Sequence, residues 1–569
     1  MLFKRIFVMT ILLLTPGISP MALTTVQSAE DEKFTKLVDE YLEFTWKTSP
    51  LFATYSGIHK YDDQIQSLSM EYARQDLEGH RSFLQRFQKE VDRSKLSQSN
   101  RIDYDLLFIG LRQQEFSLFR SRGLEQDPSI YPQIVAGLGF LMFTREYASF
   151  PERMKNLASR MEKMPQILTH GKNNLKNPPR LWTNIAIQTA SGAIQLYEQL
   201  IGPSARQFPE GDELRRRLEA ATATLTDALR SYQEFLEKDL SPRSNGNFAD
   251  GRENFVYRLK NFYMLDQSPE EIKAIAEKVL AETIEAMEAD AKKLDPNKTW
   301  WEILEEAKKK HFAAEEVLPA YQKVTERSRQ WVIDKKLASI PEEKLQVIET
   351  PVFMRYIVPY AAYNGPAPFE TEQKGFYFVT PLDSTLPQEA KDGKLGELYI
   401  DIENTTVHEA YPGHHLQAIH QNRLSKVRRL NDTALMSEGW GLYCERLGQE
   451  FGFYSSPIDS LQAYRWLLIR AVRVIVDVGM HCEGMDYDSA VKLMVEETRI
   501  EKSAAEGEVR RYTQSPTQPL AYLMGMRMIQ QLREEYKAAQ GESFDLQKFH
   551  DAVMGYGSIP LKMIRESLL

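Results

Sequence analysis

One short segment that combines histidines, a glutamate and a proline constrains this chain more than any other feature. Residues 406–420 read TVHEAYPGHHLQAIH and hold four of the ten histidines, His408, His414, His415 and His420. A His-Glu pair followed closely by further histidines is typical of a zinc hydrolase helix, in which two histidines bind the metal and the glutamate acts on water. The usual spacing is broken here, because the position four residues after His408 is Pro412, which cannot bind metal.

An unbroken helix cannot bring these histidines together. His408 and His414 would point about 120° apart and lie roughly 9 Å apart along the axis, and His415 would lie about 10.5 Å from His408. Pro412 disrupts helical hydrogen bonding and Gly413 tolerates unusual dihedral angles, so we expect a bulge at residues 411–413. Looping out two residues restores the HExxH spacing with His414, and looping out three selects His415. We favour His414; the alternative is that Pro-Gly merely ends the helix.

A candidate third ligand follows 24 residues after His414. Residues 437–445 read SEGWGLYCE and contain Glu438 and Glu445. A second helix running back past the first would bring Glu438 to the histidines, and a carboxylate as third ligand leaves one zinc position open for water. Glu438 could instead be a surface glutamate, although its apolar neighbours indicate a buried helix. Glu445 is the reserve ligand, or a hydrogen-bond partner for a ligand histidine. The expected cofactor is Zn²⁺.

Several segments together resemble a known bacterial family. They are HEAYPGHHLQ at 408–417, EGWGLYCE at 438–445, RVIVDVGMH at 473–481, the stretch from Arg511-Tyr512 to Tyr522-Leu523-Met524-Gly525, and SPLFATYSG at 49–57. The chain is similar in these to the domain of unknown function 885 (DUF885) family, which is placed among the gluzincin-type zinc metallopeptidases. The resemblance covers nearly the whole chain and implies a mostly helical zincin fold and peptide hydrolysis, without a substrate. Gly441 departs from it, since alanine is usual there, and so does the lack of a lipid-accepting cysteine.

Glu409 is the expected general base, because it adjoins the ligand His408 and can pass a proton from water to the leaving amine. The oxyanion needs a further donor. Our candidates, in order, are Tyr522, His481 and Tyr512. Tyr522 could equally be a core tyrosine.

Six residues are candidates for substrate contact or for a structural network. Arg473, Asp477 and His481 are spaced four apart, so they share one helix face and either line the cleft or form a buried network. Arg511 could bind a peptide carboxylate, with Tyr512 beside it, or could pair with Glu508. Tyr377 lies in an aromatic strand that would bind an extended peptide if it is an edge strand, and would pack in the core otherwise.

The sequence predicts a mainly α fold, with a small β-sheet beside the zinc-binding helix. Apolar periodicity predicts helices over residues 34–46, 152–164, 185–201 and 213–240, and a Ser-Pro-Glu-Glu start predicts one from Ser268 to about Leu294. β-branched and aromatic runs predict strands over 347–353, 375–380 and 396–402, after which helices resume at Thr405. A helix break is expected at 514–519. The turn-rich stretch 241–247 divides an N-terminal helical region (30–240) from a zincin-like catalytic region (241–569), although the two can form one continuous unit.

The N-terminus indicates export. Lys4 and Arg5 precede an apolar run too short to span a bilayer, and small residues follow, so residues 1–29 read as a signal peptide. The only cysteines, Cys444 and Cys482, are expected to be free thiols in helices. The net charge of −9 argues against a nucleic-acid partner. We therefore expect a periplasmic or extracellular protein with no membrane span after signal cleavage; its oligomeric state stays open.

The sequence thus favours an exported zinc metallopeptidase that hydrolyses peptides, with oligopeptides preferred by analogy. Two alternatives stay open. The same metal site could cleave a non-peptide amide or ester, or the chain could be a non-catalytic binding protein with a structural or vestigial zinc site. Glu409 argues against the second alternative, since a purely structural site needs no base.

Overall fold

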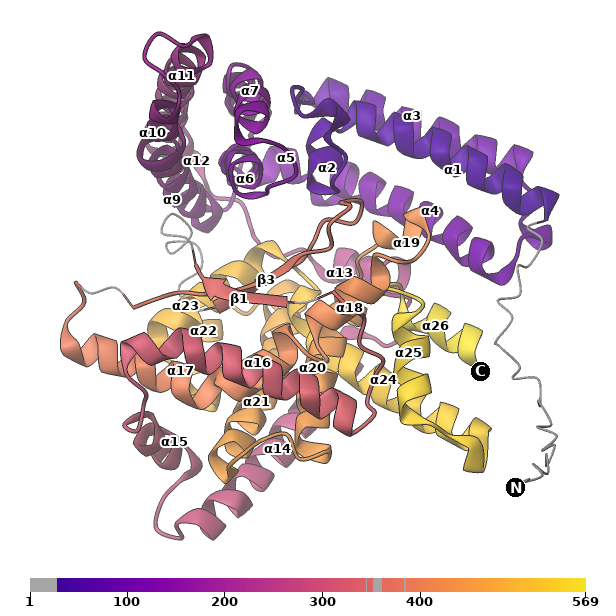
Figure 1. Cartoon of the computed structure of the whole chain (residues 1–569), viewed down its shortest axis with the longest axis vertical. Coiled ribbons are helices and arrows are strands. Elements are labelled where there is room, and N and C mark those ends of the chain that lie inside the picture. The colour runs from indigo at the N-terminus through magenta and orange to yellow at the C-terminus, as the bar shows by residue number, and fades with distance from the viewer. Residues whose placement is uncertain (1–27, 344, 351–360, 383–384) are drawn as a thin grey trace, which may run out of the picture.

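The computed structural model of the chain describes residues 28–343, 345–350, 361–382 and 385–569, and these form a mainly α protein with one small sheet (Figure 1). The first half contains α1 (Ala29–Thr48), α2 (Pro50–Tyr55), α3 (Met70–Glu90), α4 (Gln98–Phe116), α5 (Gly123–Gln126), α6 (Ile130–Thr144), α7 (Phe150–Met161), α8 (Pro165–Asn174), α9 (Arg180–Leu196), α10 (Gly202–Ser204), α11 (Glu213–Phe235), α12 (Ser241–Arg243) and α13 (Arg252–Asn261). The second half contains α14 (Pro269–Leu294), α15 (Trp300–Lys308), α16 (Val317–Asp334), α17 (Gln388–Glu409), α18 (His414–Gln421), α19 (Lys426–Arg429), α20 (Ala434–Glu450), α21 (Pro457–Cys482), α22 (Tyr487–Thr498), α23 (Lys502–Gln514), α24 (Gln518–Gln540), α25 (Leu546–Met554) and α26 (Leu561–Leu568).

Local signals in the sequence account for many of these helices. Ser268 caps α14: its hydroxyl accepts the Glu271 N–H, and the Glu271 carboxylate accepts the Ser268 N–H in return. The helices predicted over 34–46, 152–164, 185–201 and 213–240 are present as α1, α7, α9 and α11, and the last two continue through a π-helical turn to Ile201 and Leu240. The predicted break at 514–519 separates α23 from α24.

The helices of the N-terminal half belong to two separate hydrophobic cores, and the sequence does not reveal which helix belongs to which core. Helices α1, α3 and α4 share their core with α14, α20, α21 and α24 of the C-terminal half. Helices α6, α7, α8, α9 and α11 form a core of their own, at the upper left of Figure 1. The first helices therefore pack against helices beyond the predicted 240/241 boundary, whereas the helices of the second core pack among themselves.

The sheet has three strands, β1 (Leu345–Glu349), β2 (Ala361–Asn364) and β3 (Gly375–Val379), in the order β1-β3-β2. Strand β3 pairs parallel to β1 and antiparallel to β2, so it is central. The prediction of an edge strand at Tyr377 was therefore wrong. Strands β1 and β2 flank β3, so the side chains of β3 pack inside the protein. Tyr377 is fully buried and its ring contacts Tyr321 of α16. It has no surface with which to bind a substrate.

The strand predicted over 396–402 was also wrong, because these residues lie in the middle of α17. Leu398, Ile400 and Ile402 are all buried, and their alternation looks like a strand only because α17 is packed on more than one side. Helix α17 begins at Gln388, so helical structure resumes well before Thr405. Leu398 and Ile402 pack with Tyr377 and Val379, which places the sheet beside the helix that carries His408, as predicted.

Other expectations concern the ends and the thiols. The signal peptide falls almost entirely in residues 1–27, outside the described residues, as do residues 351–353 of the first predicted strand. Within the described part of the chain, no helix combines the length and apolarity needed to cross a membrane. Cys444 and Cys482 are free, each within a helix.

Candidate metal centre

A tight turn at residues 410–413 sets the geometry of the histidine segment. Helix α17 ends at Glu409 and α18 begins at His414, so the chain forms two helices where we expected one helix with a bulge. Gly413 is required here, because a Cβ at this position would collide with the carbonyl oxygen of His408. The indole N–H of Trp440 donates to the Pro412 carbonyl oxygen at 2.9 Å. The turn is therefore held against α20 by the tryptophan of the EGW segment.

This turn brings His408, His414 and Glu438 together. The two imidazole centroids lie 4.7 Å apart with nearly perpendicular planes. Oε2 of Glu438, on α20, lies 3.7 Å from Nε2 of His408 and 3.5 Å from Nε2 of His414. Ligand atoms about 2.1 Å from a tetrahedral zinc are separated by roughly 3.4 Å, so these spacings fit a zinc ion. Within the described residues, these three form the one group of histidine, cysteine and acidic side chains that could hold a metal.

Glu445 orients His408. Nδ1 of His408 donates to Oε1 of Glu445 at 2.8 Å, which leaves Nε2 directed at Glu438. Burial alone would lower the pKa of His408, but the Glu438 and Glu445 carboxylates raise the pKa to about 10. Gly441 gives the imidazole its room, since a Cβ at 441 would lie 2.5 Å from Cε1 of His408. The reserve ligand of the sequence analysis is therefore placed as a hydrogen-bond partner of a ligand.

His415 lies away from this cluster. It is buried and turns toward the sheet, where its Nδ1 lies 3.2 Å from the hydroxyl of Tyr363 on β2. Its ring also packs edge-on against Tyr411. The sequence left open whether His414 or His415 is the second candidate ligand. The geometry brings His414, and not His415, to Glu438 and His408.

Glu409, the candidate base, ends α17 directly beside His408 and is partly exposed. In the part of the chain that the structure describes, its carboxylate has no hydrogen-bond or ion-pair partner. Its negative charge reaches Tyr363, Tyr377 and Tyr321, whose pKa values burial raises first and Glu409 raises further. A carboxylate without a structural partner beside a metal ligand is suited to proton transfer.

Two glycines bring Tyr522 to the cluster. Helices α20 and α24 cross where Gly439 meets Gly525, and a Cβ on either glycine would strike the backbone of the other helix. Tyr522 of α24 consequently stacks on His408, with ring centroids 6.3 Å apart. Burial and the Glu438 carboxylate raise the pKa of Tyr522, which keeps its phenol protonated and able to donate. The guanidiniums of Arg470 and Arg473 lie 4.5 and 5.0 Å from the same ring.

Gln518 is a residue that the sequence analysis missed. Its Nε2 lies 3.4 Å from Oε1 of Glu438 and 3.5 Å from the hydroxyl of Tyr522, so it lies between the candidate ligand and the candidate donor. The side-chain oxygen of Gln518, Oε1, accepts a hydrogen bond from Arg511 at 2.7 Å. Only its position in the Pro-rich start of α24 hinted at a role, because contacts between helices cannot be read from local patterns.

Arg511 and Tyr512 belong to an ion-pair network around Glu508. Arg511, Arg473 and the Tyr512 hydroxyl all donate to Oε2 of Glu508, at 3.1, 2.7 and 2.5 Å. These partners outweigh burial and lower the pKa of Glu508 to about 2. The salt bridge that was the alternative for Arg511 is therefore present, although the guanidinium stays partly exposed. Tyr512 is fully buried, so its hydroxyl supports this network.

His481 lies in the buried network that was the alternative to a catalytic role. Its Nδ1 accepts the Asp250 N–H at 3.2 Å and its Nε2 donates to the Tyr512 carbonyl oxygen at 3.1 Å. With both ring nitrogens bonded to the backbone, no N–H is left to donate to an oxyanion. The structure therefore places His481, like Tyr512 and Tyr377, among residues that support the fold.

Comparison with known proteins gives a family without a known activity. Residues 50–568 match the family described as bacterial protein of unknown function (DUF885). No curated protein matches the chain. A solved structure from Shewanella oneidensis, of a protein proposed to be a lipoprotein and of unknown function, is 25% identical with a TM-score of 0.81, over 94% of this chain and 99% of that chain. A second, from Colwellia psychrerythraea and also proposed to be a lipoprotein, is 20% identical with a TM-score of 0.79, over 95% and 99%. The chain belongs to the DUF885 family.

Proposed function

We propose that this protein is a zinc-dependent metallohydrolase of the gluzincin type that cleaves peptides. The observation that carries the proposal is the convergence of His408, His414 and Glu438, whose ligand atoms all lie within 4.8 Å of one another. Two histidines and one carboxylate are a ligand set typical of catalytic zinc. When bound, zinc would supply Lewis-acid activation of water and of the substrate carbonyl.

The chain's own residues divide the remaining chemistry. Glu409 accepts a proton from the attacking water and returns it to the leaving amine, a role for which its carboxylate is available because it pairs with no group in the described part of the chain. The Tyr522 phenol donates to the substrate oxygen as negative charge develops there. Glu445 accepts from Nδ1 of His408, so that Nε2 is the nitrogen that would give up its proton to bind zinc, and Gln518 restrains Glu438.

Two alternatives are compatible with the same cluster. Cleavage of a non-peptide amide or ester needs the same base and donor, so only substrates can separate it from peptide cleavage. A non-catalytic binding protein would use the cluster as a structural zinc site. Glu409 favours the enzyme: among the residues that the structure describes its carboxylate has no partner, and a structural site gives no reason for a carboxylate in this position.

We infer that the protein is exported, to the periplasm or beyond. The basic and apolar N-terminus supports this, and so does the description of both similar structures as proposed lipoproteins. No nucleic-acid partner is proposed, in keeping with the net charge of −9.

The proposed function is tested by comparing the wild-type protein with Glu409→Gln and with Glu389→Gln, an exposed glutamate in the first turn of the same helix. Zinc content and cleavage of a complex peptide mixture are measured together by mass spectrometry. We expect Glu409→Gln to keep zinc and lose cleavage, and Glu389→Gln to keep both. Cleavage that persists in Glu409→Gln would refute the assignment of the base. If the wild type binds zinc but cleaves no peptide, ester and amide substrates come next.

A further inference from the structure

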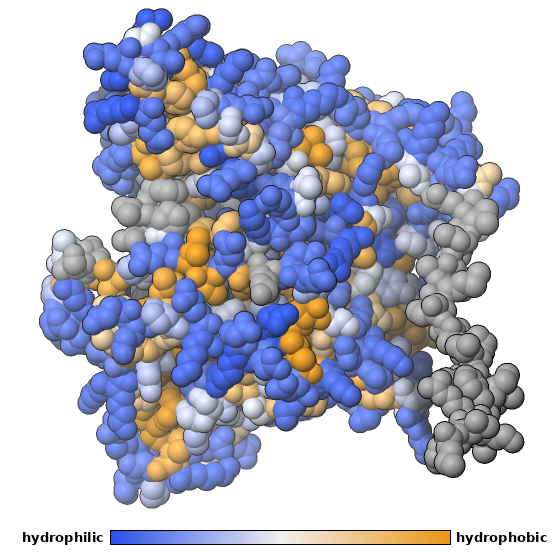
Figure 2. All heavy atoms as spheres, viewed as in Figure 1, coloured by the Kyte–Doolittle hydropathy of each residue, from blue (hydrophilic) through white to orange (hydrophobic). Residues whose placement is uncertain are grey.

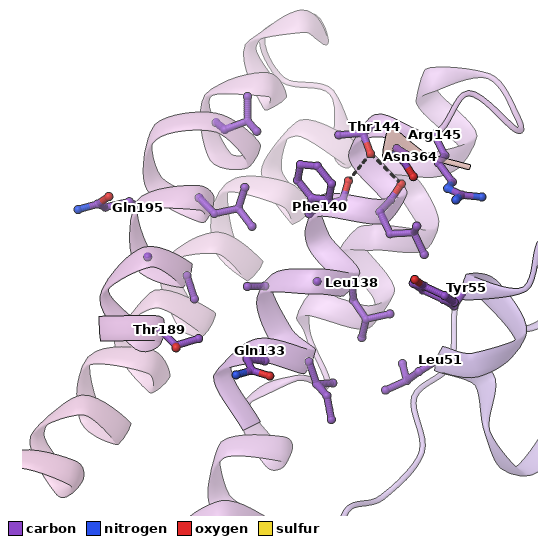
Figure 3. A pocket seen from close by; sticks show the side chains of 18 of the residues that line it. Leu51, Tyr55, Gln133, Leu138, Phe140, Thr144, Arg145, Thr189, Gln195 and Asn364 are labelled. Carbon is purple, nitrogen blue, oxygen red and sulfur yellow. Dashed lines mark hydrogen bonds between the residues drawn. The ribbon is translucent and has the colours of Figure 1, made fainter. Parts of the chain in front are cut away.

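A large apolar cavity lies beside the metal centre, between the N-terminal helices and the sheet. Its volume is about 1040 Å³, at the upper end of the range for ligand pockets. Its walls come from α2, α6, α9, β2 and β3, and Figure 3 shows Leu51 and Tyr55 of α2, Gln133, Leu138 and Phe140 of α6, and Thr189 and Gln195 of α9. Figure 2 shows apolar atoms gathered on this upper left part of the molecule. None of the three candidate ligands lines the cavity.

Tyr363 joins the cavity to the centre on the sheet side. It lines the cavity from β2, and its hydroxyl lies 3.2 Å from Nδ1 of His415, the residue after the ligand His414. The charge of Glu409 also reaches Tyr363, where it adds to burial in raising the pKa of the phenol. The cavity wall and the histidine segment therefore meet at Tyr363.

A second connection runs through α9 and α23. The Trp182 indole donates to the Thr513 hydroxyl at 3.1 Å, and Arg510 donates to Gln188, a cavity residue, at 3.4 Å. The neighbour of Arg510 is Arg511, which hydrogen-bonds Gln518 and through it reaches Glu438. The cavity wall is thus hydrogen-bonded to the helix that carries Arg511.

The lining indicates what the cavity would bind. Among its described lining residues only Arg145 is charged, and that charge is paired with Glu370 at 3.0 Å. The remaining surface is mostly apolar, interrupted by the carboxamides of Gln133, Gln188, Gln195, Gln199 and Asn364. Burying a charged group here would be costly, whereas carboxamides match the alternating donors and acceptors of a peptide backbone. Four of the five carboxamides, all but that of Asn364, face solvent, so a peptide backbone can replace the water bound to them, whereas an alkyl chain would displace that water and offer no hydrogen bond in return.

We propose that this cavity is the substrate-binding chamber of the enzyme and takes an uncharged, apolar segment of a peptide. The inference rests on the proposed function and adds the substrate class to it. The peptide's apolar side chains lie against α6 and α9, and its adjacent bond reaches the metal centre past Tyr363.

A larger side chain at position 137 can obstruct the cavity without disturbing α6. It lines the cavity from α6, and a Cβ at this position would meet nothing within 4 Å, so a larger side chain enters open space without straining the helix. Gly110 of α4 is the matched control, since it is also a helical glycine whose Cβ would meet nothing within 4 Å, and it does not line the cavity. Gly137→Trp fills volume and Gly137→Glu adds an unpaired charge.

Binding is measured by fluorescence anisotropy on Glu409→Gln protein, so that turnover is not needed. The probes are N-fluorescein, C-amide hexapeptides that differ only in a central Leu-Phe, Lys-Lys or Glu-Glu pair, and an alanine hexapeptide with a dodecanoyl chain. We expect the Leu-Phe peptide to bind most tightly. Gly137→Trp and Gly137→Glu should weaken it by roughly tenfold or more, about the affinity that burial of one large apolar side chain provides. Gly110→Trp and Gly110→Glu should not change it.

The other outcomes separate this inference from the proposed function. If the Gly137 variants cleave peptides as fast as the wild type does, the metallopeptidase assignment stands and the chamber is overturned. Tightest binding of a charged peptide, or of the dodecanoyl probe alone, would overturn the proposed substrate class. Binding of the Leu-Phe peptide that depends on Gly137, without any cleavage, would support the chamber and count against the proposed chemistry. Absence of binding by any probe would overturn the chamber.

Discussion

The 2.8 Å hydrogen bond from Nδ1 of His408 to Oε1 of Glu445 fixes which nitrogen of His408 faces the metal centre. Glu445 is fully buried in α20, and although burial raises its pKa, His408 and nearby arginines keep the pKa below its ordinary value. The carboxylate therefore stays ionised and keeps a proton on Nδ1, so that Nε2 is the nitrogen free to bind the metal. We predict that Glu445→Ala weakens zinc binding by about 10- to 100-fold, measured by competition with a chromophoric chelator. Glu450→Gln, an exposed glutamate on the same helix, is the control and should keep the wild-type affinity.

The turn at Gly413 makes a separate prediction. A Cβ here collides with the backbone carbonyl of His408, which cannot move aside as a flexible side chain could. We expect Gly413→Ala to lower stability by about 1–3 kcal/mol and to displace His414, so that zinc content falls as well. Gly507→Ala on α23, where a Cβ would meet nothing within 4 Å, should leave zinc content unchanged and should not lower the melting temperature, because alanine is favoured over glycine inside a helix. Full zinc occupancy in Gly413→Ala would count against the turn as the device that places His414.

Tyr522 tests the assignment of the oxyanion donor. Tyr522→Phe keeps the ring that stacks on His408 and removes only the hydroxyl. Loss of one such donor lowers kcat by about 10²–10³-fold. We expect this loss in steady-state kinetics, with KM and zinc content nearly unchanged. Tyr512→Phe is the contrasting variant, because its hydroxyl bonds Glu508, and it should lower stability more than kcat. A kcat loss confined to Tyr512→Phe would reverse the assignment.

His481 predicts a dependence of stability on pH. Burial lowers its pKa to about 4, so in the folded protein the imidazole stays neutral until the pH approaches that value. In the unfolded chain a histidine has a pKa of about 6.5. The contribution of His481 to the free energy of unfolding is therefore fully present above about pH 6.5. It falls by about 3 kcal/mol as the pH drops from 6.5 to 4.

The test of this prediction is the melting temperature of wild type and His481→Gln across pH 8 to 4. The variant should be less stable at pH 8 and should lose less on acidification, with peptide cleavage at pH 8 retained. His311→Gln, a half-buried histidine outside the core, should follow the wild-type curve. If His481→Gln abolishes kcat while its melting temperature is unchanged, His481 has a catalytic role after all.

Local rules allowed the helices to be predicted, but the sequence patterns did not distinguish a doubly packed helix from a strand. Ser268, Pro269 and Glu271 start α14 through contacts within four residues, so the sequence contains all that is needed. Leu398, Ile400 and Ile402 of α17 are all buried and alternate with charged or exposed residues, so their two-residue spacing is the same as that of a half-buried strand. The central position of β3 depends on β1 and β2, which pair with it from elsewhere in the chain.

The candidate centre could be assembled from the sequence because its chemistry requires particular residue types. His408, His414, Glu438 and Glu409 follow from what a zinc hydrolase needs, and the structure brings the three candidate ligands together beside the candidate base. Gln518 could not be foreseen, since its contact with Glu438 joins α24 to α20. His481 was misjudged for the same reason: Asp250, which occupies one of its ring nitrogens, is 231 residues away.

The most direct test of the central claim is the metal content of the purified protein, by elemental mass spectrometry, for wild type, His414→Ala and His415→Ala in parallel. Circular dichroism would establish that all three are folded. The geometry predicts one equivalent of zinc in wild type and in His415→Ala, and its loss in His414→Ala. Zinc lost only with His415→Ala would contradict the assigned ligand, and no zinc in any of the three, even after reconstitution, would contradict the metal centre itself.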